Sequence, residues 1–270
     1  MLTVRSYAKI NWSLRITGKR ADGYHDLETL FQQISLHDVL TFAPADALTL
    51  TCDDPSIPVD ETNLVLRAAR LLGAPPVAIA LQKHIPAGGG LGGGSSNAAA
   101  TLLTLNRMFS LGRRDLPELA LQLGSDVPFF LGGGTAYAVG RGEVLTPLTA
   151  AAPIPLLLLL PEERVLTRDA FARIRTFSPP LGLDRYRAIV EDDVFAHEPE
   201  LINDFEEPVF SLLPRLRELR DRLRATGAAW AHMSGSGSTI VGAFTNQHAR
   251  DHALSLFDDI RAVAAETIGP

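Results

Sequence analysis

The sequence predicts an α+β protein, because strand-like and helix-like patterns both occur and no internal repeat is present. Residues 1 to about 145 are rich in strand patterns with helical stretches between them. Beyond Pro161 the pattern becomes helical, and a strand over Ser238–Phe244 then precedes a last helix at about 247–265. At 270 residues the chain is near the length at which one hydrophobic core tends to split, so one large domain and two unequal domains both fit.

The predicted domain boundary is the proline-rich stretch 147–161, which divides the chain into 1–150 and 151–270. Within it, Leu156–Leu160 is a short continuous apolar run and predicts a buried strand. The apolar stretch Ala150–Pro161 is too short to span a bilayer. Since no apolar signal core follows the early basic residues, we expect no membrane partner.

Composition favours an ordinary globular protein over a disordered one, with 46% apolar and 21% charged residues. The net charge of -6 and the lack of a dense basic run argue against a nucleic-acid partner. The arginines of 215–224 alternate with leucines at helical spacing, which predicts an amphipathic helix with a solvated face. Cys52 is the only cysteine, so no disulfide can form within the chain, and a cytoplasmic location is expected.

Local patterns also predict elements in the first half of the chain. Thr3–Thr17 has strand character and is followed by turn chemistry at Asp22–Gly23, and alternation predicts a strand over 77–83. Ser95 and Ser96 are expected to cap a helix that carries an apolar stripe. A second helix is expected after 115, with a capping box and a glycine stop formed by Asp115, Pro117, Glu118 and Gly124.

The segment between that strand and the first of these helices has six glycines in the seven positions 88–94. Glycine lets the backbone approach an anion closely, and the helix that follows offers free N–H groups, so a di- or triphosphate ligand is expected. A flexible linker is the alternative. The spacing of Gly88, Gly90 and Gly93 also satisfies the dinucleotide fingerprint, whereas the lysine position of a P-loop is occupied by Gly94. Spacing alone therefore leaves dinucleotide and triphosphate ligands open.

Two further segments stand out. Asp126 lies in Gly124–Phe130, just past a helix end, and is equally compatible with a catalytic carboxylate and a turn-forming one. Met233–Ser238 alternates serine and glycine before a strand. It is typical of a turn between two strands, with a second phosphate-side loop as the alternative.

Taken in this order, the three segments resemble the GHMP kinase superfamily. Within it, Ala8-Lys-Ile-Asn11, Asp22-Gly-Tyr-His25 and Leu30-Phe31 are similar to the 4-diphosphocytidyl-2-C-methyl-D-erythritol kinase family, as are the glycine loop and Asp126-Val-Pro-Phe-Phe130. The resemblance covers most of the chain and is weakest at about 150–200. It implies a two-domain fold, with a first domain like ribosomal protein S5 domain 2, a ferredoxin-like second domain and ATP in a cleft between them.

The resemblance also implies an activity, which is ATP-dependent phosphorylation of the 2-hydroxyl of 4-diphosphocytidyl-2-C-methyl-D-erythritol in the non-mevalonate isoprenoid pathway. Asp126 matches the catalytic base and Lys9 the lysine that keeps it ionised. Asn11 is expected to hold the same end of the substrate. The aromatic positions expected near cytidine are Tyr24, His25, Phe31 and Phe171, although Phe31 and Phe171 are core aromatics in the alternative interpretation, which for Phe171 is about equally favoured.

For ATP, the resemblance places Asn63 and Lys83 near the adenine. The phosphates are expected on Gly88, Gly89, Gly90, Leu91, Gly92, Gly93, Gly94, Ser95, Ser96 and Asn97. Mg²⁺ is expected with the nucleotide, held mostly by phosphates and water, and no protein metal site is expected. Ser125 and Trp12 depart from the family's usual smaller residues and leave the fine substrate geometry open.

Three other functions remain as hypotheses: another GHMP kinase such as homoserine kinase, a dinucleotide-dependent oxidoreductase, and a non-catalytic binder on the kinase fold. The Asp22–His25 segment argues against the first. The helical stretch after the loop's helix argues against the second, and the presence of Lys9 and Asp126 argues against the third. The expected partner is a small-molecule substrate, and the expected state is a monomer or weak homodimer.

Overall fold

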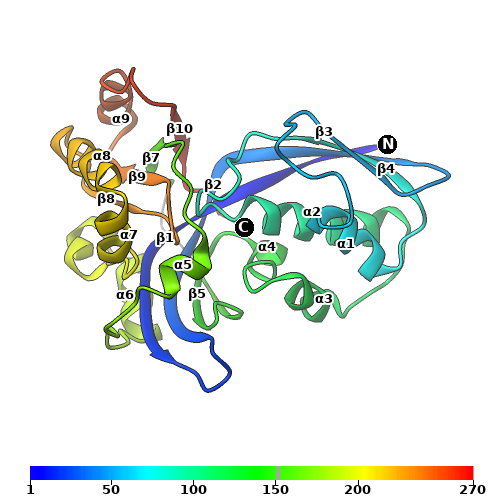
Figure 1. The fold of residues 1–270 in the computed structure, drawn as a ribbon, viewed down its shortest axis with the longest axis horizontal. Coiled ribbons are helices and arrows are strands. Elements are labelled where there is room, and N and C mark those ends of the chain that lie inside the picture. The colour runs from blue at the N-terminus through cyan, green and yellow to red at the C-terminus, as the bar shows by residue number, and fades with distance from the viewer. Residues whose placement is uncertain (150–152, 270) are drawn as a thin grey trace. The chain divides into compact units, whose positions relative to one another are not determined.

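The computed structural model describes residues 1–149 and 153–269. It separates into two compact units (Figure 1). The first unit comprises Met1–Ala8, Leu36–Ala87 and Gly92–Gly133, and the second comprises the rest of the chain. The domain boundary predicted between residues 150 and 151 lies outside the described residues and stays a prediction.

The first unit packs helices against strands. Strands β1 (Leu2–Lys19) and β2 (His25–Pro44) contribute residues to both units. In the first unit, β4 pairs antiparallel with residues 39–44 of β2 and parallel with β3. The remaining elements are β3 (Thr49–Cys52), α1 (Leu64–Leu72), β4 (Val77–Gln82), α2 (Gly93–Met108), α3 (Leu116–Leu123) and α4 (Phe129–Gly132). The strands predicted over 3–17 and 77–83 are therefore confirmed.

Helix α2 begins before the predicted serine cap, and that prediction is wrong. Gly92 is the N-cap in a left-handed conformation, and none of the described side chains caps the helix. Ser96 instead lies inside the helix, where its hydroxyl accepts from Ser6 Oγ at 2.7 Å and donates to Tyr7 O at 2.6 Å. Both partners belong to β1, so this serine ties the helix to a strand, a tertiary contact that no local pattern contains.

The capping box predicted at Asp115 is also wrong, although the helix α3 is present. No described side chain bonds the N-terminus of α3. The Asp115 carboxylate binds the Arg113 guanidinium instead, with Nε donating to Oδ1 at 2.7 Å. A neighbouring cation competes successfully with backbone N–H groups because a charge-assisted hydrogen bond is the stronger one.

The second unit contains an antiparallel sheet of order β10-β7-β9-β8. Residues 27–32 of β2 also pair with β5, and β5 pairs with β6. Helices α8 and α9 pack beside the four-stranded sheet (Figure 1). The elements are β5 (Thr135–Gly140), β6 (Val144–Leu148), β7 (Pro155–Leu159), α5 (Thr167–Phe171), α6 (Leu183–Glu191), the 3₁₀ helix η1 (Val194–Glu200), α7 (Glu206–Leu212), α8 (Pro214–Ala225), β8 (Trp230–Met233), β9 (Ile240–Ala243), α9 (Gln247–Leu254) and β10 (Ala262–Glu266).

Three predictions in this unit are confirmed by the elements. The leucine-rich run at 156–160 is the buried strand β7. The arginine-rich helix is α8, which buries Leu216, Leu219 and Leu223 against the sheet. The turn between two strands predicted at Met233–Ser238 joins β8 to β9, and residues 234–239 are called the hairpin loop below.

The last helix predicted over 247–265 is wrong in extent. Helix α9 ends at Leu254, and the chain then forms β10, which pairs antiparallel with β7 from Ala262–Leu159 to Glu266–Pro155. The alanines of β10 favour a helix by propensity, but pairing with a buried strand outweighs that preference. Within the described residues, none of the helices combines the length and apolar character needed to cross a bilayer.

Candidate functional site

Lys9 is held in β1 by a short chain of polar contacts. Its side chain is buried, its Nζ donates to Asn11 Oδ1 at 2.7 Å, and it lies 5.1 Å from the centroid of the Phe31 ring. Asn11 Nδ2 donates to Thr29 Oγ1 at 2.7 Å, and Thr29 Oγ1 donates to Ser13 O at 2.6 Å. Since the threonine proton is already used, Thr29 can only accept from Asn11, which turns the amide oxygen toward Lys9. Asn11 therefore positions the ammonium group.

The first half of the glycine loop, Gly88–Leu91, packs on the hairpin loop. Thr239 N donates to Gly89 O at 3.2 Å, and Ser234 Oγ donates to Gly90 O at 3.0 Å. Gly90 has φ +78°, and a Cβ built there would collide with the Ser234 carbonyl oxygen. Glycine at 90 is thus required by a close backbone approach inside the protein, apart from any ligand.

The second half of the glycine loop forms the start of α2. Gly92 has φ 70°, which favours glycine, and a Cβ at Gly93 would lie 2.9 Å from Ile85 Cγ2. Gly94 is exposed, and a Cβ there would meet nothing closer than 3.8 Å. The helix therefore begins with bare backbone and with no capping side chain among the described residues. Uncapped N–H groups at the positive end of a helix dipole are suited to bind phosphate.

Lys83 and Asn97 are joined by Asp38, a carboxylate that is fully buried. Lys83 Nζ donates to Asp38 Oδ2 at 2.8 Å and also to Ile85 O. Asn97 Nδ2 donates to the same Oδ2 at 3.0 Å, while the backbone N–H of Ile85 donates to Oδ1 at 2.8 Å. The Asn97 Oδ1 is buried and has no hydrogen-bond partner within the described part of the chain. These contacts give Lys83 a structural role within the first unit, where it joins Asp38 to the backbone of Ile85.

The other residues predicted for ATP lie at helix starts. Asn63 caps α1, accepting from Val65 N at 2.9 Å. Ser95 is half-buried in the first turn of α2, one residue before the buried Ser96. The predicted ATP roles of Asn63, Lys83 and these serines stay predictions, while their structural contacts are those given above.

Asp126 lies in a turn between α3 and α4. The turn is closed by Val127 N, which donates to Gly124 O at 3.2 Å, and the Asp126 side chain is half-buried. A carboxylate in this place is partly accessible and is carried on a short, hydrogen-bonded backbone segment. Asp126 belongs to the first unit and Lys9 to the second, so their predicted pairing stays a prediction.

The predicted cytidine residues fall into three environments within the second unit. His25 and Phe171 stack, with ring centroids 4.9 Å apart and an interplanar angle of 17°. Tyr24 is 55% exposed, and the Arg141 guanidinium lies 4.9 Å above its ring. Phe31 is buried beside Lys9. The structure therefore brings His25 and Phe171 together and leaves Phe31 with the lysine.

The His25–Phe171 pair is suited to stack a flat base. Burial, with a smaller contribution from Lys19, holds the pKa of His25 below its ordinary value, so the imidazole is neutral at neutral pH. In this arrangement the two rings contact each other directly. A base between them requires about 7 Å between the ring planes, twice the contact distance of about 3.5 Å, so the rings must separate to admit one.

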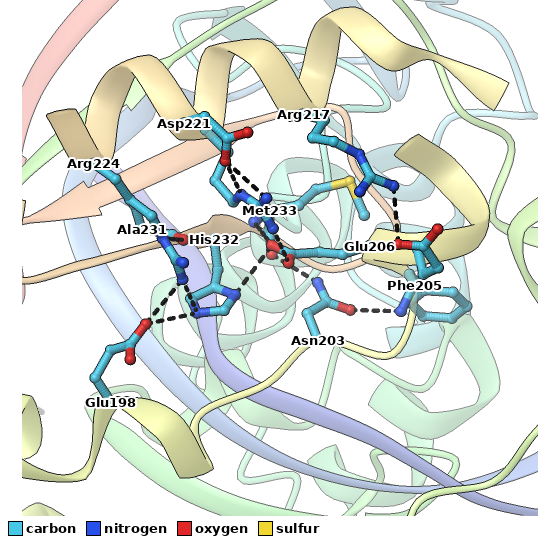
Figure 2. A network of polar contacts seen from close by, with 12 residues as sticks. Glu198, Asn203, Phe205, Glu206, Arg217, Asp221, Arg224, Ala231, His232 and Met233 are labelled. Atoms are coloured by element: carbon cyan, nitrogen blue, oxygen red, sulfur yellow. Dashed lines mark hydrogen bonds and ion pairs between the residues drawn. The ribbon is translucent and has the colours of Figure 1, made fainter. Parts of the chain in front are cut away.

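Two polar residues missed by the sequence analysis, Asn203 and Glu206, hold the end of β8 (Figure 2). Glu206 is 8% exposed, and its Oε1 accepts from Met233 N at 2.7 Å and from His232 Nδ1 at 3.1 Å. Arg220 Nη1 donates to Glu206 Oε2 at 3.2 Å. The sequence signal for these residues was the run of polar side chains in 203–206, shortly after η1. No local pattern indicates which strand this segment contacts.

The Glu206 carboxylate predicts an acid-sensitive contribution to stability. Burial alone raises its pKa, but bonds from His232 and Met233 N and the charge of Arg220 together hold it below the ordinary 4.5. Because a depressed carboxylate pKa stabilises the folded state above the unfolded pKa, this contribution is present at neutral pH and is lost as pH falls below about 4.5. Urea unfolding at pH 7 and pH 3.5 is expected to show less acid destabilisation for Glu206→Gln than for wild type. Equal losses in both would contradict this assignment.

No group of three or more His, Cys, Asp or Glu side chains suited to hold a metal ion occurs among residues 1–149 and 153–269. Asp38, Asn203 and Glu206 are buried polar residues that the sequence analysis did not identify; Asp38 binds Lys83 and Asn97, and the other two hold Met233.

Comparison with known proteins places the chain among the GHMP kinases. The family model for the GHMP kinases N terminal domain matches residues 63–134, and the model for GHMP kinases C terminal matches residues 192–256. The chain is 42% identical to a 4-diphosphocytidyl-2-C-methyl-D-erythritol kinase of Prosthecochloris aestuarii, over 93% of this chain and 92% of the relative. It is 41% identical to the protein of the same name from Salinibacter ruber, over 92% and 91% of the two chains.

Solved structures are similar to the chain as well. A crystal structure of 4-(cytidine 5'-diphospho)-2C-methyl-D-erythritol kinase superposes with a TM-score of 0.88 at 39% identity, covering 100% of both chains. Homoserine kinase from Cytophaga hutchinsonii, at 20% identity and a TM-score of 0.68 over 100% of this chain and 96% of its own, shares the fold. The two-domain α+β fold class predicted from the sequence is confirmed by these matches. The chain belongs to the GHMP kinase superfamily and, within it, to the 4-diphosphocytidyl-2-C-methyl-D-erythritol kinase family.

Proposed function

We propose that this protein transfers the γ-phosphoryl group of ATP to the 2-hydroxyl of 4-diphosphocytidyl-2-C-methyl-D-erythritol, a reaction of the non-mevalonate route to isoprenoid precursors. The observation that carries the proposal is the uncapped, glycine-lined start of α2, which offers bare N–H groups to phosphate. Family membership at about 40% identity supports the acceptor substrate.

The fold also disfavours the dinucleotide hypothesis. A Rossmann site needs a parallel strand after the helix that follows the glycine loop. Here α2 is followed by α3 and α4 instead. The spacing of Gly88, Gly90 and Gly93 that matches the dinucleotide fingerprint is accounted for otherwise: Gly88 and Gly90 have positive φ, and Gly90 and Gly93 lie against neighbouring atoms.

Phosphoryl transfer needs alignment and charge neutralisation more than covalent help from the protein. In the proposed mechanism Asp126 accepts or orients the proton of the attacking hydroxyl. The Lys9 ammonium, held by Asn11 at 2.7 Å, stabilises the negative charge that develops on the attacking oxygen. The N–H groups of α2 and the backbone of the glycine loop hold the phosphates in line.

Mg²⁺ is proposed to accompany ATP. The ion prefers octahedral oxygen ligands, keeps several waters and is commonly bound through substrate phosphates rather than a protein cage. The ion would neutralise phosphate charge. A cytoplasmic location and a monomeric or weakly dimeric state stay predictions.

The decisive experiment is a coupled assay of ADP release with purified protein, ATP and Mg²⁺, with and without diphosphocytidyl-methylerythritol. Release stimulated strongly by this substrate is expected, with homoserine and mevalonate as comparison acceptors. Equal stimulation by homoserine would move the proposal to another GHMP kinase. NAD binding tighter than ATP binding by calorimetry would overturn kinase function.

Replacing Phe171 by alanine is expected to weaken binding of the cytidine substrate selectively. Base stacking contributes about 1–3 kcal/mol, so KM for diphosphocytidyl-methylerythritol should rise about 5- to 150-fold while KM for ATP stays within twofold. Phe171→Tyr keeps the ring and serves as the control. Because Phe171 also packs edge-on against Phe205, at a centroid distance of 4.8 Å, the stability of each variant is measured by urea unfolding. An unchanged substrate KM in a folded Phe171→Ala protein would exclude a base-stacking role.

A further inference from the structure

The segment Ile202–Glu206 joins β1 to the hairpin loop within the second unit. Leu14 N donates to Ile202 O at 2.7 Å, and Asp204 N donates to Leu14 O at 2.9 Å. The Asp204 carboxylate accepts from Ile16 N at 2.7 Å. Backbone and side-chain bonds therefore fix this segment against the same strand that carries Lys9 and Asn11.

Asn203 holds one side of the hairpin loop. Its Nδ2 donates to Met233 O at 2.7 Å and to Gly235 O at 2.8 Å, and its Oδ1 accepts from Phe205 N at 2.9 Å (Figure 2). Because carbonyl oxygens only accept, the amide has a single orientation that satisfies all three bonds. The residue is 7% exposed, so these bonds are shielded from water.

Glu206 holds the same residue from the other side. Its Oε1 accepts the Met233 N–H, so both backbone polar groups of Met233 are bound by side chains of one short segment. His232 Nδ1 bonds the same Oε1 at 3.1 Å, and Arg220 Nη1 donates to Oε2 at 3.2 Å. The carboxylate is thus fixed by groups on β8 and α8.

The hairpin loop in turn is hydrogen-bonded to the glycine loop. Besides the bonds from Ser234 and Thr239 to Gly90 and Gly89, a Cβ at Gly235 would lie 3.1 Å from Gly90 O, so the two backbones are in close contact. Leu91 O then accepts from Lys9 N at 3.0 Å, so the glycine loop is bonded to β1 as well. The contacts form a closed ring from β1 through Ile202–Glu206, the hairpin loop and the glycine loop back to β1.

We propose that Asn203 and Glu206 are positioning residues for phosphoryl transfer, which hold the hairpin loop so that the glycine loop keeps its phosphate-binding shape at a set distance from Lys9. The inference rests on the proposed kinase function. Buried polar groups are costly compared with apolar packing, but they specify backbone position more sharply. Phosphoryl transfer depends on such positioning, because small displacements of a reacting group lower the rate steeply.

The sharpest test is Asn203→Asp. The substitution keeps the side-chain volume and the acceptor for Phe205 N, but it places a carboxylate oxygen against the carbonyls of Met233 and Gly235. KM for ATP is expected to rise about 10- to 100-fold, and the Kd of a fluorescent ATP analogue, measured without the second substrate, should rise in parallel. KM for diphosphocytidyl-methylerythritol should stay within twofold. A purely structural role would lower stability and leave the ATP affinity of the folded protein unchanged.

Two substitutions at Glu206 compare a conservative change, which should preserve ATP affinity, with one that should lower it. Glu206→Gln keeps an acceptor for Met233 N and should keep KM for ATP within about threefold. Glu206→Leu removes the acceptor and should raise it about tenfold or more. Equal ATP affinity in both would contradict the positioning role.

Two further variants separate an effect on ATP affinity from an effect on folding. Ser234→Ala removes only the bond to Gly90 O and is expected to raise the Kd for the ATP analogue about fivefold, and an unchanged Kd would count against the ring. Asn246→Ala removes the cap of α9, where Asn246 Oδ1 accepts from Ala249 N at 2.9 Å. It should lower the urea midpoint without changing ATP affinity.

Two outcomes distinguish the proposed function from the positioning role. If the wild-type protein binds the analogue but shows no turnover, the proposed function fails. If the wild-type protein is active and Asn203→Asp binds the analogue with unaltered affinity, only the positioning role is refuted.

Discussion

Asp126→Asn is expected to lower kcat about 10²- to 10⁴-fold, the range that a positioned general base contributes. Asparagine has nearly the same size and accepts a hydrogen bond, but it cannot take the proton of the attacking hydroxyl or carry negative charge. KM for both substrates should change little, because the loss occurs in the transition state. Steady-state kinetics with the coupled ADP assay measure both quantities.

The same substitution separates catalysis from turn formation. Asparagine stabilises turns about as well as aspartate, so the turn between α3 and α4 should survive and urea unfolding should be close to wild type. Ser125→Ala, in the neighbouring position, is the control and should keep kcat within about twofold. If Asp126→Asn retains more than half of wild-type kcat, Asp126 is a turn residue and the proposed base is wrong.

Gly90→Ala is expected to disrupt both stability and ATP binding. A left-handed conformation costs a non-glycine residue about 1–2 kcal/mol, and overpacking against the hairpin loop adds about 1–3 kcal/mol. The new Cβ would lie 3.2 Å from Gly237 O and closer still to the Ser234 carbonyl, so one of the two loops must move. We expect a loss of about 2–5 kcal/mol in the free energy of unfolding and at least a tenfold rise in KM for ATP.

Two other glycines make this test specific. Gly112 has φ +64° and no atom within 4 Å of a built Cβ, so Gly112→Ala should show the conformational cost alone. Gly94→Ala places a methyl group at the open start of α2, where alanine favours the helix by about 0.5–1 kcal/mol. It should keep or raise stability while raising KM for ATP. Unchanged ATP affinity in Gly94→Ala would show that phosphate does not bind this turn.

Local patterns predicted those elements whose causes are local. The leucines of α8 recur at helical spacing and become its buried face. The Ser-Gly repeat after Met233 forms a loop between strands, as expected from its turn residues. Where sequence reasoning failed, a distant partner decided the outcome. Ser96 binds β1, Asp115 binds Arg113, and the alanines of β10 pair with β7.

The same distinction applies to the candidate site. The glycine loop was predicted to bind phosphate from its residue types, whereas the roles of Lys9 and Asp126 were predicted from the resemblance to the kinase family. Asp38, Asn203 and Glu206 act by holding backbone that is more than 25 residues away, and a carboxylate or amide in one segment carries no sign of its distant partner. Gly90 was predicted to bind phosphate. The structure adds a close contact with Ser234 that by itself requires glycine at this position.

The way the chain is divided between the units has a consequence for synthesis on the ribosome. Every residue of the first unit has been made once residue 133 emerges. The second unit also uses residues 9–35, yet β7 lacks its neighbour β10 until Ala262–Glu266 has been translated, and Ile268 N still has to reach Gln33 O. Lys9 therefore belongs to a unit that is complete only after residue 268 has been translated. Until β10 is made, the apolar strand Pro155–Leu159 has an unpaired edge, which is a segment for a chaperone to shield.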